Sequence, residues 1–255
     1  MKSLDLNADL GEGFGPWIMG DDAAMLEIVS TANVACGAHA GDPQVMRATV
    51  LAATRHGVAV GAHPGYADLA GFGRRTMPGM TQAEVENLVA YQAGALAGIC
   101  ALVGHPMTHV KTHGALGNAA ADDDGLAMAV ARAIRAVDPA LGFMVMPGTA
   151  TVRAAEACGL RPINEIYADR TYAPGFNLTP RKNADAMIHD PALALARILE
   201  VVESGRLTAT DGSHLAVQID SICVHGDGPT AVAMARSLRE GLMGAGYAIR
   251  SALAK

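Results

Sequence analysis

Aromatic residues are scarce in this chain: they make up 4% of its 255 residues and include a single Trp. Hydrophobic residues nevertheless account for 51% of the sequence, so a large core must be filled mainly by aliphatic side chains and Met. The 29 Gly residues favour close packing of helices on strands over a loose β-sandwich. A chain of this length commonly forms one large α/β domain, and we expect residues 1–255 to form a single domain.

The charge pattern and the N-terminal segment exclude several classes of partner and location. The net charge is −6, the pI is near 5.8 and no basic run occurs, which argues against nucleic acid or an anionic membrane as the main partner. The N-terminus lacks the apolar run of a signal peptide, and no stretch approaches the roughly 18 uninterrupted apolar residues of a membrane helix. The four Cys residues are scattered, which favours reduced thiols. We expect a soluble, cytoplasmic protein.

Short apolar runs alternate with segments that carry helix-capping signals. Asp42 marks the start of one helix and Gly57 its end, while similar signals begin helices at Thr81 and Asp190, and Pro229 is expected to open the last helix. The apolar runs predict strands near residues 3–9, 31–36, 58–62, 107–111, 142–146, 162–166 and 215–224. This alternation predicts parallel strands covered by helices. An open sheet and a closed barrel both fit it.

Neither of two common nucleotide-binding motifs is found in the sequence. The first predicted strand leads into Gly11-Glu12-Gly13-Phe14-Gly15, where the Glu12 carboxylate stands in the place that a pyrophosphate would need. The pattern G-x-x-x-x-G-K-[ST] does not occur anywhere in the chain. The residues alone therefore do not predict nucleotide binding.

The first predicted strand carries polar side chains at alternate positions. Asp5, Asn7 and Asp9 alternate with apolar residues, so the three polar side chains point to one face of the strand. If the strand belongs to a barrel, that face is interior, and burying polar groups is costly unless they are paired or functional. In the ordinary structural alternative, Asp5 faces solvent and Glu12 is a loop carboxylate. We take Asn7, Asp9 and Glu12 as candidate site residues.

Basic and acidic side chains also follow the later predicted strands. Lys111 and His113 lie two residues apart and therefore share a face, and His225 and Asp227 repeat this spacing after the last strand. The carboxyl ends of parallel strands share one rim, where active sites form. Further residues expected at this rim are Asn33, His39, His63, Arg74, Glu165 and Arg170.

Other polar residues have simpler explanations. Asp42 is most simply a helix N-cap, and Cys36 is a buried small hydrophobe. Asp227 is also explained as a helix cap, and for Arg74 and Arg75 surface solubility is as good an explanation as binding a carboxylate. The remaining histidines fall at predicted helix ends, turns or strand starts and are set aside: His56, His105, His109, His189 and His214.

Taken together, six segments make the chain resemble a known family. These are DLNADLGE (5–12), NVACGAHAGDP (33–43), GAHPGYADLAGFGRR (61–75), VKTHGALGN (110–118), EIYADRTY (165–172) and SICVHGDGP (221–229). Their order and spacing resemble those of the LamB/YcsF family. The chain departs from the family pattern at Thr112, where Pro is common, and at Gly117, where an aromatic residue is usual. Lys111, His113 and Asn118 are kept.

The resemblance implies a fold, a reaction and partners. The implied fold is a distorted seven-stranded parallel β/α barrel, related to glycoside hydrolase and polysaccharide deacetylase barrels. The implied reaction is the ATP-dependent hydrolysis of the lactam of 5-oxoproline (pyroglutamate) to L-glutamate, with ATP and Mg²⁺ used by the complex. The implied partners are two allophanate-hydrolase-like chains, the B and C subunits of 5-oxoprolinase. A homo-oligomer is also compatible with the sequence.

The chemistry of lactam opening suggests roles for the candidate residues. Asp9 or Glu12 is expected to act as the base and His113 or His225 as the acid, while Lys111 stabilises negative charge and Asp227 is a further catalytic candidate. The residues expected to bind the substrate are Asn7, Asn33, His39, His63, Arg74, Glu165 and Arg170.

Two other interpretations of the sequence stay open. In one, Asp9, His39 and His63 bind a divalent metal, and the protein is a metal-dependent amide hydrolase of the deacetylase type. In the other, the chain is a non-catalytic subunit that binds the substrate of a lactam-utilising complex.

Overall fold

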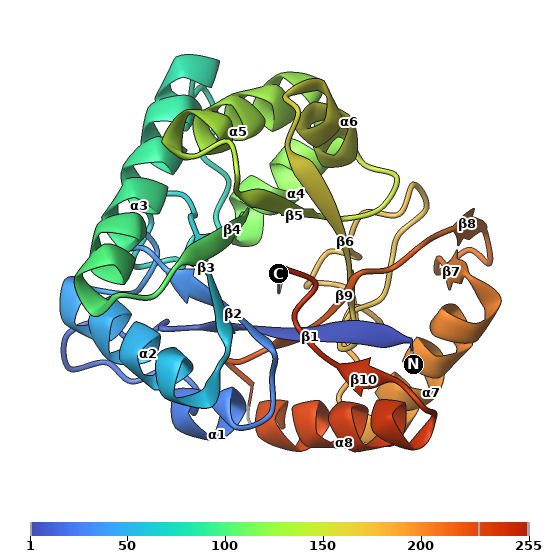
Figure 1. Ribbon diagram of the computed structural model, residues 1–255. Helices are drawn as coiled ribbons and strands as arrows, with labels where there is room; N and C mark the ends of the chain where they lie inside the picture. Colours follow the sequence, from blue (N-terminus) through green and yellow to red (C-terminus); the bar gives the residue numbers. More distant parts are fainter. Residues whose placement is uncertain (1, 229, 254–255) are drawn as a thin grey trace.

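Seven parallel strands close into a barrel in the computed structural model, which describes residues 2–228 and 230–253. Their order around the barrel is β1 (Ser3–Leu10), β2 (Thr31–Ala35), β3 (Ala59–His63), β4 (Met107–Lys111), β5 (Gly142–Val145), β6 (Arg161–Tyr167) and β9 (Ser221–His225). The ring closes because β9 pairs with β1 as well as with β6. The predicted seven-stranded parallel barrel is therefore confirmed (Figure 1).

Helices surround the barrel and bury their apolar faces against its outer surface (Figure 1). They are α1 (Asp22–Leu26), α2 (Pro43–His56), α3 (Gln82–Val103), α4 (Gly114–Asp122), α5 (Asp124–Val137), α6 (Ala150–Ala157), α7 (Pro191–Ser204) and α8 (Ala231–Gly244). The predicted caps at Asp42 and Asp190 are confirmed, since both side chains accept hydrogen bonds from first-turn amides. The helix start predicted at Thr81 is also confirmed, and Thr81 forms a capping box with Glu84. Pro229 lies outside the described residues.

By length and composition, α3 is the one helix in the described part of the chain that is apolar enough to cross a membrane. One third of its most apolar window is buried. Its buried residues include Val85, Val89 and Leu96, which belong to the core of the barrel. In this structure α3 is one of the helices that cover the barrel, where it packs against α2 and α5 (Figure 1).

The last predicted strand, at 215–224, is only partly correct. The strand of the barrel begins at Ser221, whereas β8 (His214–Ala216) pairs antiparallel with β7 (Arg206–Thr208) in a separate hairpin. Residues 217–219 between them belong to no strand, and the chain bends at Asp220, whose carboxylate accepts a hydrogen bond from the backbone N–H of Asn164, 2.8 Å away. An apolar run alone does not reveal such a break. A short strand that was not predicted, β10 (Ala248–Ile249), pairs with the start of β1.

The interior of the barrel is polar at its amino end. The Asp5 side chain is buried and accepts hydrogen bonds from the hydroxyls of Ser30, Thr31 and Ser221. Burial raises the pKa of the Asp5 carboxyl to about 6, against the opposing effect of these hydroxyls. The alternative that Asp5 faces solvent at a frayed strand is therefore wrong, because β1 lies between β2 and β9 in the barrel.

Candidate functional site

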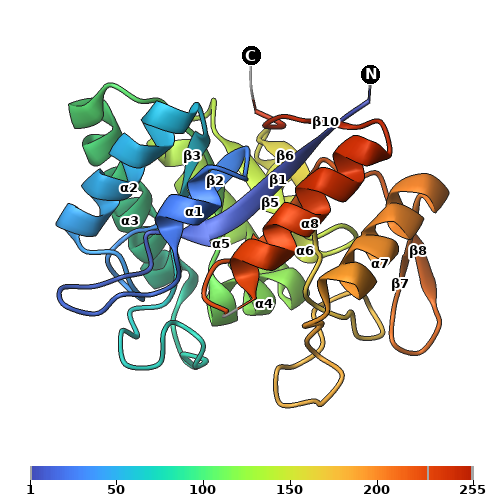
Figure 2. The ribbon, with the colours of Figure 1, turned by 90° about the horizontal axis from the view of Figure 1, so that it is seen from below.

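A cavity of about 450 Å³ opens where the strands end. In Figure 2 the loops that follow the strands gather at the lower end of the barrel, on the side opposite the two chain termini. The cavity wall includes eight residues that the sequence predicted as site residues: Asp9, His63, Arg74, Lys111, His113, Glu165, Arg170 and His225. Side chains from β1, β3, β4, β6 and β9 therefore meet at one rim.

Lys111 is the central charge of the cavity floor. Its Nζ donates a hydrogen bond to Asp9 Oδ1 at 2.9 Å and forms an ion pair with Glu165 Oε1, also at 2.9 Å. All three side chains are buried. Burial alone would lower the pKa of the Lys111 ammonium, but Asp9, Cys223 and Glu165 outweigh it and raise this pKa well above its ordinary value. Lys111 is therefore a permanently charged group at neutral pH.

The Asp9 carboxylate is held in its charged form. Burial would raise its pKa, but His63 and Lys111 outweigh that effect and lower the pKa well below its ordinary value. Asn33 Nδ2 donates to Asp9 Oδ1 at 2.9 Å and also to Asn7 Oδ1 at 2.8 Å. Asn7 and Asn33 are fully buried and are not among the residues that line the cavity. Of these two predicted substrate-binding residues, Asn33 therefore orients Asp9, and Asn7 accepts a second hydrogen bond from the same Asn33 amide.

His109, which was set aside on sequence grounds, supports this layer. Its Nε2 lies 2.8 Å from Asn33 Oδ1, and burial lowers the pKa of the ring to about 3. A Cβ at Gly61 would lie 2.3 Å from the His109 ring, so glycine is required where β3 passes this side chain. His109 is a structural side chain that fixes the Asn33 amide, and it is not among the residues that line the cavity.

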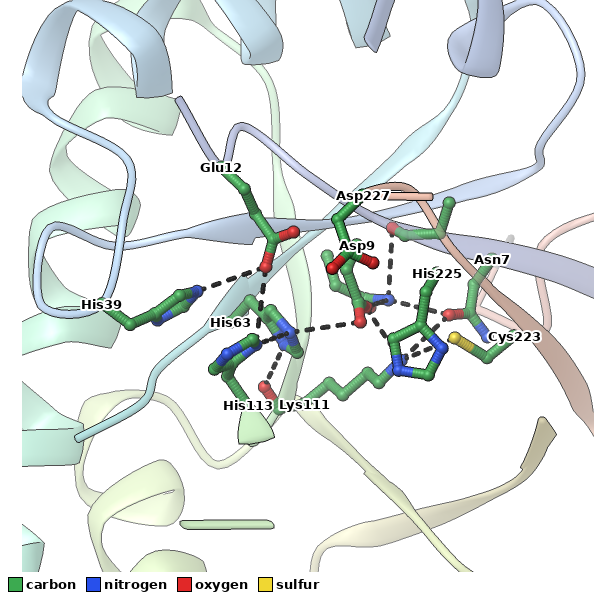
Figure 3. Close-up of polar contacts among 12 residues, drawn as sticks. Asn7, Asp9, Glu12, His39, His63, Lys111, His113, Cys223, His225 and Asp227 are labelled. Atoms are coloured by element: carbon green, nitrogen blue, oxygen red, sulfur yellow. Dashed lines mark hydrogen bonds and ion pairs between the residues drawn. The ribbon is translucent and has the colours of Figure 1, made fainter. Parts of the chain in front are cut away.

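A second cluster, formed by Glu12, His39, His63 and His113, lies beside the cavity (Figure 3). Glu12 Oε1 is 3.4 Å from both His39 Nε2 and His113 Nδ1. His63 Nε2 is 3.0 Å from His113 Nδ1 and 3.4 Å from Asp9 Oδ2. One candidate ligand atom from each of the four side chains lies within 4.8 Å of the other three. Of the predicted metal set, His39 and His63 are in this group, while Asp9 lies at its edge and pairs with Lys111.

The loop after β3 packs closely on this cluster. A Cβ at Gly65 would lie 2.8 Å from His39 Nδ1, and one at Gly73 would lie 2.8 Å from His39 Cβ. Gly73 also has a positive φ of 62°, which favours glycine. Gly65 and Gly73, in the loop that follows His63, therefore have a steric reason. Burial lowers the pKa of His39 and of His113 well below the ordinary value, and burial next to Asp9 and Asp227 raises that of Glu12 well above it.

His225 is oriented by a carboxylate that was not among the predicted site residues. Asp169 Oδ2 lies 2.8 Å from His225 Nδ1, so the imidazole N–H donates to the carboxylate. The Tyr167 ring stacks on the His225 ring, with 5.3 Å between the ring centroids. This arrangement leaves Nε2 of His225 for a group in the cavity. The sequence did contain a signal for Asp169, because it follows β6 directly at the same rim.

The arginines near the cavity differ in what they contact. Arg74 forms an ion pair with Asp227 at 2.6 Å. Arg170 uses its guanidinium to donate to the carbonyl oxygens of Thr179 and Ala186. Arg181, which was not predicted, is exposed and lines both the main cavity and a neighbouring one of about 230 Å³. Arg170 therefore holds the loop, while Arg181 is the guanidinium better placed for a ligand.

The second cavity is lined in part by acid–base side chains. Asp227, predicted to be catalytic, lines this neighbouring cavity, and so does His189, which was set aside. His225 and Arg181 lie between the two cavities and line both. Cys36 is buried as expected, and burial raises the pKa of its thiol to about 12.

Fold and site together define a parallel β/α-barrel protein with a buried acid–base site at the carboxyl ends of its strands. The chain belongs to the LamB/YcsF family, whose model matches residues 4–255. It is 52% identical over 236 residues to the A subunit of 5-oxoprolinase from Rhodopseudomonas palustris, a match that covers 92% of this chain and 93% of the relative. The A subunit of 5-oxoprolinase from Azorhizobium caulinodans is 53% identical over 249 residues, 98% of each chain.

Solved structures agree with the fold. The crystal structure of a lactam utilization protein from Thermus thermophilus matches with a TM-score of 0.91 and 43% identity, covering 98% of this chain and 100% of that one. The catalytic domain of a peptidoglycan N-acetylglucosamine deacetylase from Eubacterium rectale matches with a TM-score of 0.52 and 11% identity, covering 98% of this chain and 88% of that one. At this level of identity, the second match concerns the barrel fold alone.

Proposed function

We propose that this chain is a subunit of an ATP-dependent 5-oxoprolinase, which hydrolyses the lactam of 5-oxoproline to L-glutamate. The observation that carries the proposal is the fixed ammonium of Lys111, which lines the cavity between the carboxylates of Asp9 and Glu165. The names of the relatives, which are a lactam utilization protein and 5-oxoprolinase subunits, support a lactam as the substrate. Because several relatives are named as subunits, an assembly with other chains is also supported.

Opening an unstrained lactam requires an activated water, stabilisation of the oxyanion and a proton for the leaving nitrogen. Lys111 is the group that would stabilise negative charge on the carbonyl oxygen, because it stays protonated. His225, oriented by Asp169, is the acid–base group that would move the proton. Asp9 is a poor base, because its charge is paired with Lys111. Its proposed role is to hold the ammonium in place.

The carboxylate of 5-oxoproline needs a cation at the mouth of the cavity. Arg181 fits this role, because it lines the cavity and is not held by backbone carbonyls. Arg74 lines the same cavity but is paired with Asp227, so a substrate carboxylate would compete with that residue. Arg170 is already bonded to two carbonyl oxygens. We therefore assign the carboxylate to Arg181 in preference to Arg170.

The complex is proposed to consume ATP with Mg²⁺ and to contain two allophanate-hydrolase-like partners, as the family resemblance implies. The sequence contains no phosphate-binding loop of the G-x-x-x-x-G-K-[ST] type, so we assign no nucleotide site to the chain. The chain is proposed to act in the cytoplasm as one domain of residues 1–255. The start and the end of the described chain lie together, because β1, near the start, pairs with β10, near the end.

Metal-dependent amide hydrolysis is the second candidate function. The observation that favours it is the cluster of Glu12 with three histidines beside the cavity. In a third candidate the chain only binds the substrate and its partners perform the chemistry. An assay of glutamate formation from 5-oxoproline separates the first two functions when it is run on the chain alone and with its two partners, each with and without ATP; a substitution in the barrel site, measured in the complex, separates the first from the third. ATP-dependent turnover only in the complex supports the proposal, and ATP-independent turnover by the chain alone supports metal-dependent hydrolysis.

A further inference from the structure

The cluster of Glu12, His39, His63 and His113 contains buried polar atoms that lack partners. Within the part of the chain that the structure describes, Glu12 Oε1 and both ring nitrogens of His39 form no hydrogen bond. All four side chains are buried. A buried polar atom without a partner costs about 1–3 kcal/mol, so the three unpartnered atoms of Glu12 and His39 need an explanation.

Hydrogen bonds to the backbone fix the tautomers of two of the rings. His63 Nδ1 lies 2.8 Å from the carbonyl oxygen of Lys111, and His113 Nε2 lies 2.8 Å from that of Phe72. Because a carbonyl oxygen only accepts, each of these nitrogens carries the proton in the neutral ring. The opposite nitrogens, His63 Nε2 and His113 Nδ1, then direct their lone pairs at each other across 3.0 Å. Metal-binding histidines are usually fixed in this way by a carbonyl or carboxylate on the far nitrogen.

The spacing of the ligand atoms suits a transition-metal ion. Tetrahedral ligands about 2.1 Å from an ion lie about 3.4 Å from one another. Glu12 Oε1 lies 3.4 Å from His39 Nε2 and from His113 Nδ1, and the two lone pairs of His63 and His113 are 3.0 Å apart. His39 stacks parallel on His113 with 3.7 Å between centroids, so one of these rings must turn for both to reach the same ion.

We propose that Glu12, His39, His63 and His113 bind one divalent transition-metal ion of the zinc type. Three imidazoles with one carboxylate match the ligands that Zn²⁺ takes, whereas Ca²⁺ and Mg²⁺ prefer oxygen ligands. His63 and His113 also line the main cavity, so the ion lies at the wall where the substrate would bind. A bound ion of this type supplies a Lewis acid that polarises a carbonyl oxygen. The proposal does not depend on the identity of the substrate.

Metal binding to the full chain is the test, measured without any activity assay. The protein is stripped with a chelator and titrated with Zn²⁺ by calorimetry, and bound zinc is counted by elemental analysis after dialysis. We expect one equivalent per chain and a Tm that rises with Zn²⁺ concentration. With Co²⁺ as a second probe, we expect the visible absorption of a tetrahedral site. If the unsubstituted chain shows no saturable binding of one equivalent, the proposal is overturned.

Substitutions identify the ligands. Glu12→Gln keeps the shape of the side chain and His113→Asn replaces the imidazole with a smaller amide, and each should weaken Zn²⁺ binding by about 100-fold or more. The matched control is His189→Gln, which removes an exposed histidine that borders the second cavity and should leave the Kd unchanged. Asp9→Asn tests the alternative ligand set of Asp9, His39 and His63, which contains Asp9 in place of Glu12 and His113. If Asp9→Asn abolishes binding and Glu12→Gln does not, the assignment of Glu12 is wrong.

Discussion

Lys111 Nζ lies 2.9 Å from Asp9 Oδ1, although the two residues are 102 positions apart in the chain. The barrel brings them together, because β1 and β4 both point their carboxyl ends at the same cavity. Both groups are buried and both are held in their charged forms. This pair sets the electrostatics of the site, and its removal has consequences for stability as well as for chemistry.

Lys111→Met should destabilise the protein by about 3–5 kcal/mol, because it leaves the buried charges of Asp9 and Glu165 without a counter-ion. Urea unfolding monitored by circular dichroism measures this loss. Adding Glu165→Gln should recover part of it, since one uncompensated charge is then removed. Lys182→Met, at an exposed lysine outside the two cavities, is the control and should change stability little. A loss below about 1 kcal/mol for Lys111→Met, the size of a surface ion pair, would contradict the buried pair.

The buried carboxyl of Asp5 should make stability depend on pH. Its pKa is about 6 in the folded chain against 3.8 for the free group, so the folded chain keeps a proton that the unfolded chain has lost. The contribution of Asp5 to the free energy of unfolding therefore falls as the pH rises from about 4 to about 6, by on the order of 3 kcal/mol.

Asp5→Asn should remove this dependence, which is measured as the difference from the unsubstituted chain in unfolding experiments at pH 4 and pH 6. Using the difference cancels the contributions of other carboxylates, such as Asp9, whose pKa shifts the other way. Glu240→Gln, at an exposed position on α8, is the control. A parallel pH profile for Asp5→Asn and the unsubstituted chain would show that Asp5 titrates normally.

Arg181→Met should raise the KM for 5-oxoproline about 10- to 100-fold with little change in Tm, because it removes one charge-assisted hydrogen bond to the substrate carboxylate. Arg170→Met should instead lower the Tm, since the Arg170 guanidinium bonds two carbonyl oxygens of the neighbouring loop. Steady-state kinetics of the assembled complex and thermal melts measure the two effects. If the kinetic loss follows Arg170 and Arg181→Met is neutral, the carboxylate site is misassigned.

Much of the architecture could be predicted from local patterns. The caps at Asp42, Thr81 and Asp190 lie where predicted, because a cap depends on residues within one turn. The rim residues were predicted because parallel strands align their carboxyl ends, and closure of the barrel then brings Asp9, Lys111 and His225 to one cavity. The strand at 215–224 was placed too early, because the first part of this apolar run pairs with β7 in a hairpin, and a pairing between distant segments leaves no local pattern.

The sequence could not predict which partner each polar group contacts. Asp9, Glu12 and Asp169 are all carboxylates at one rim, but only the barrel determines that they face Lys111, the histidine cluster and His225 respectively. Arg181 follows no strand and lies in an irregular segment between β6 and α7, so no periodic pattern marks it.

Residues of this barrel are proposed to open the lactam themselves, and the decisive test is His225→Asn in the assembled complex. The side chain is partly exposed to the cavity, and an Asn amide can still donate to Asp169 in place of the ring N–H, so the variant should fold and assemble. We predict that the rate of glutamate formation from 5-oxoproline falls by about two to four orders of magnitude, while His189→Asn leaves it unchanged. A rate within about threefold of the unsubstituted complex, too small a loss for a missing acid–base group, would contradict this claim and assign the chemistry to the partner chains.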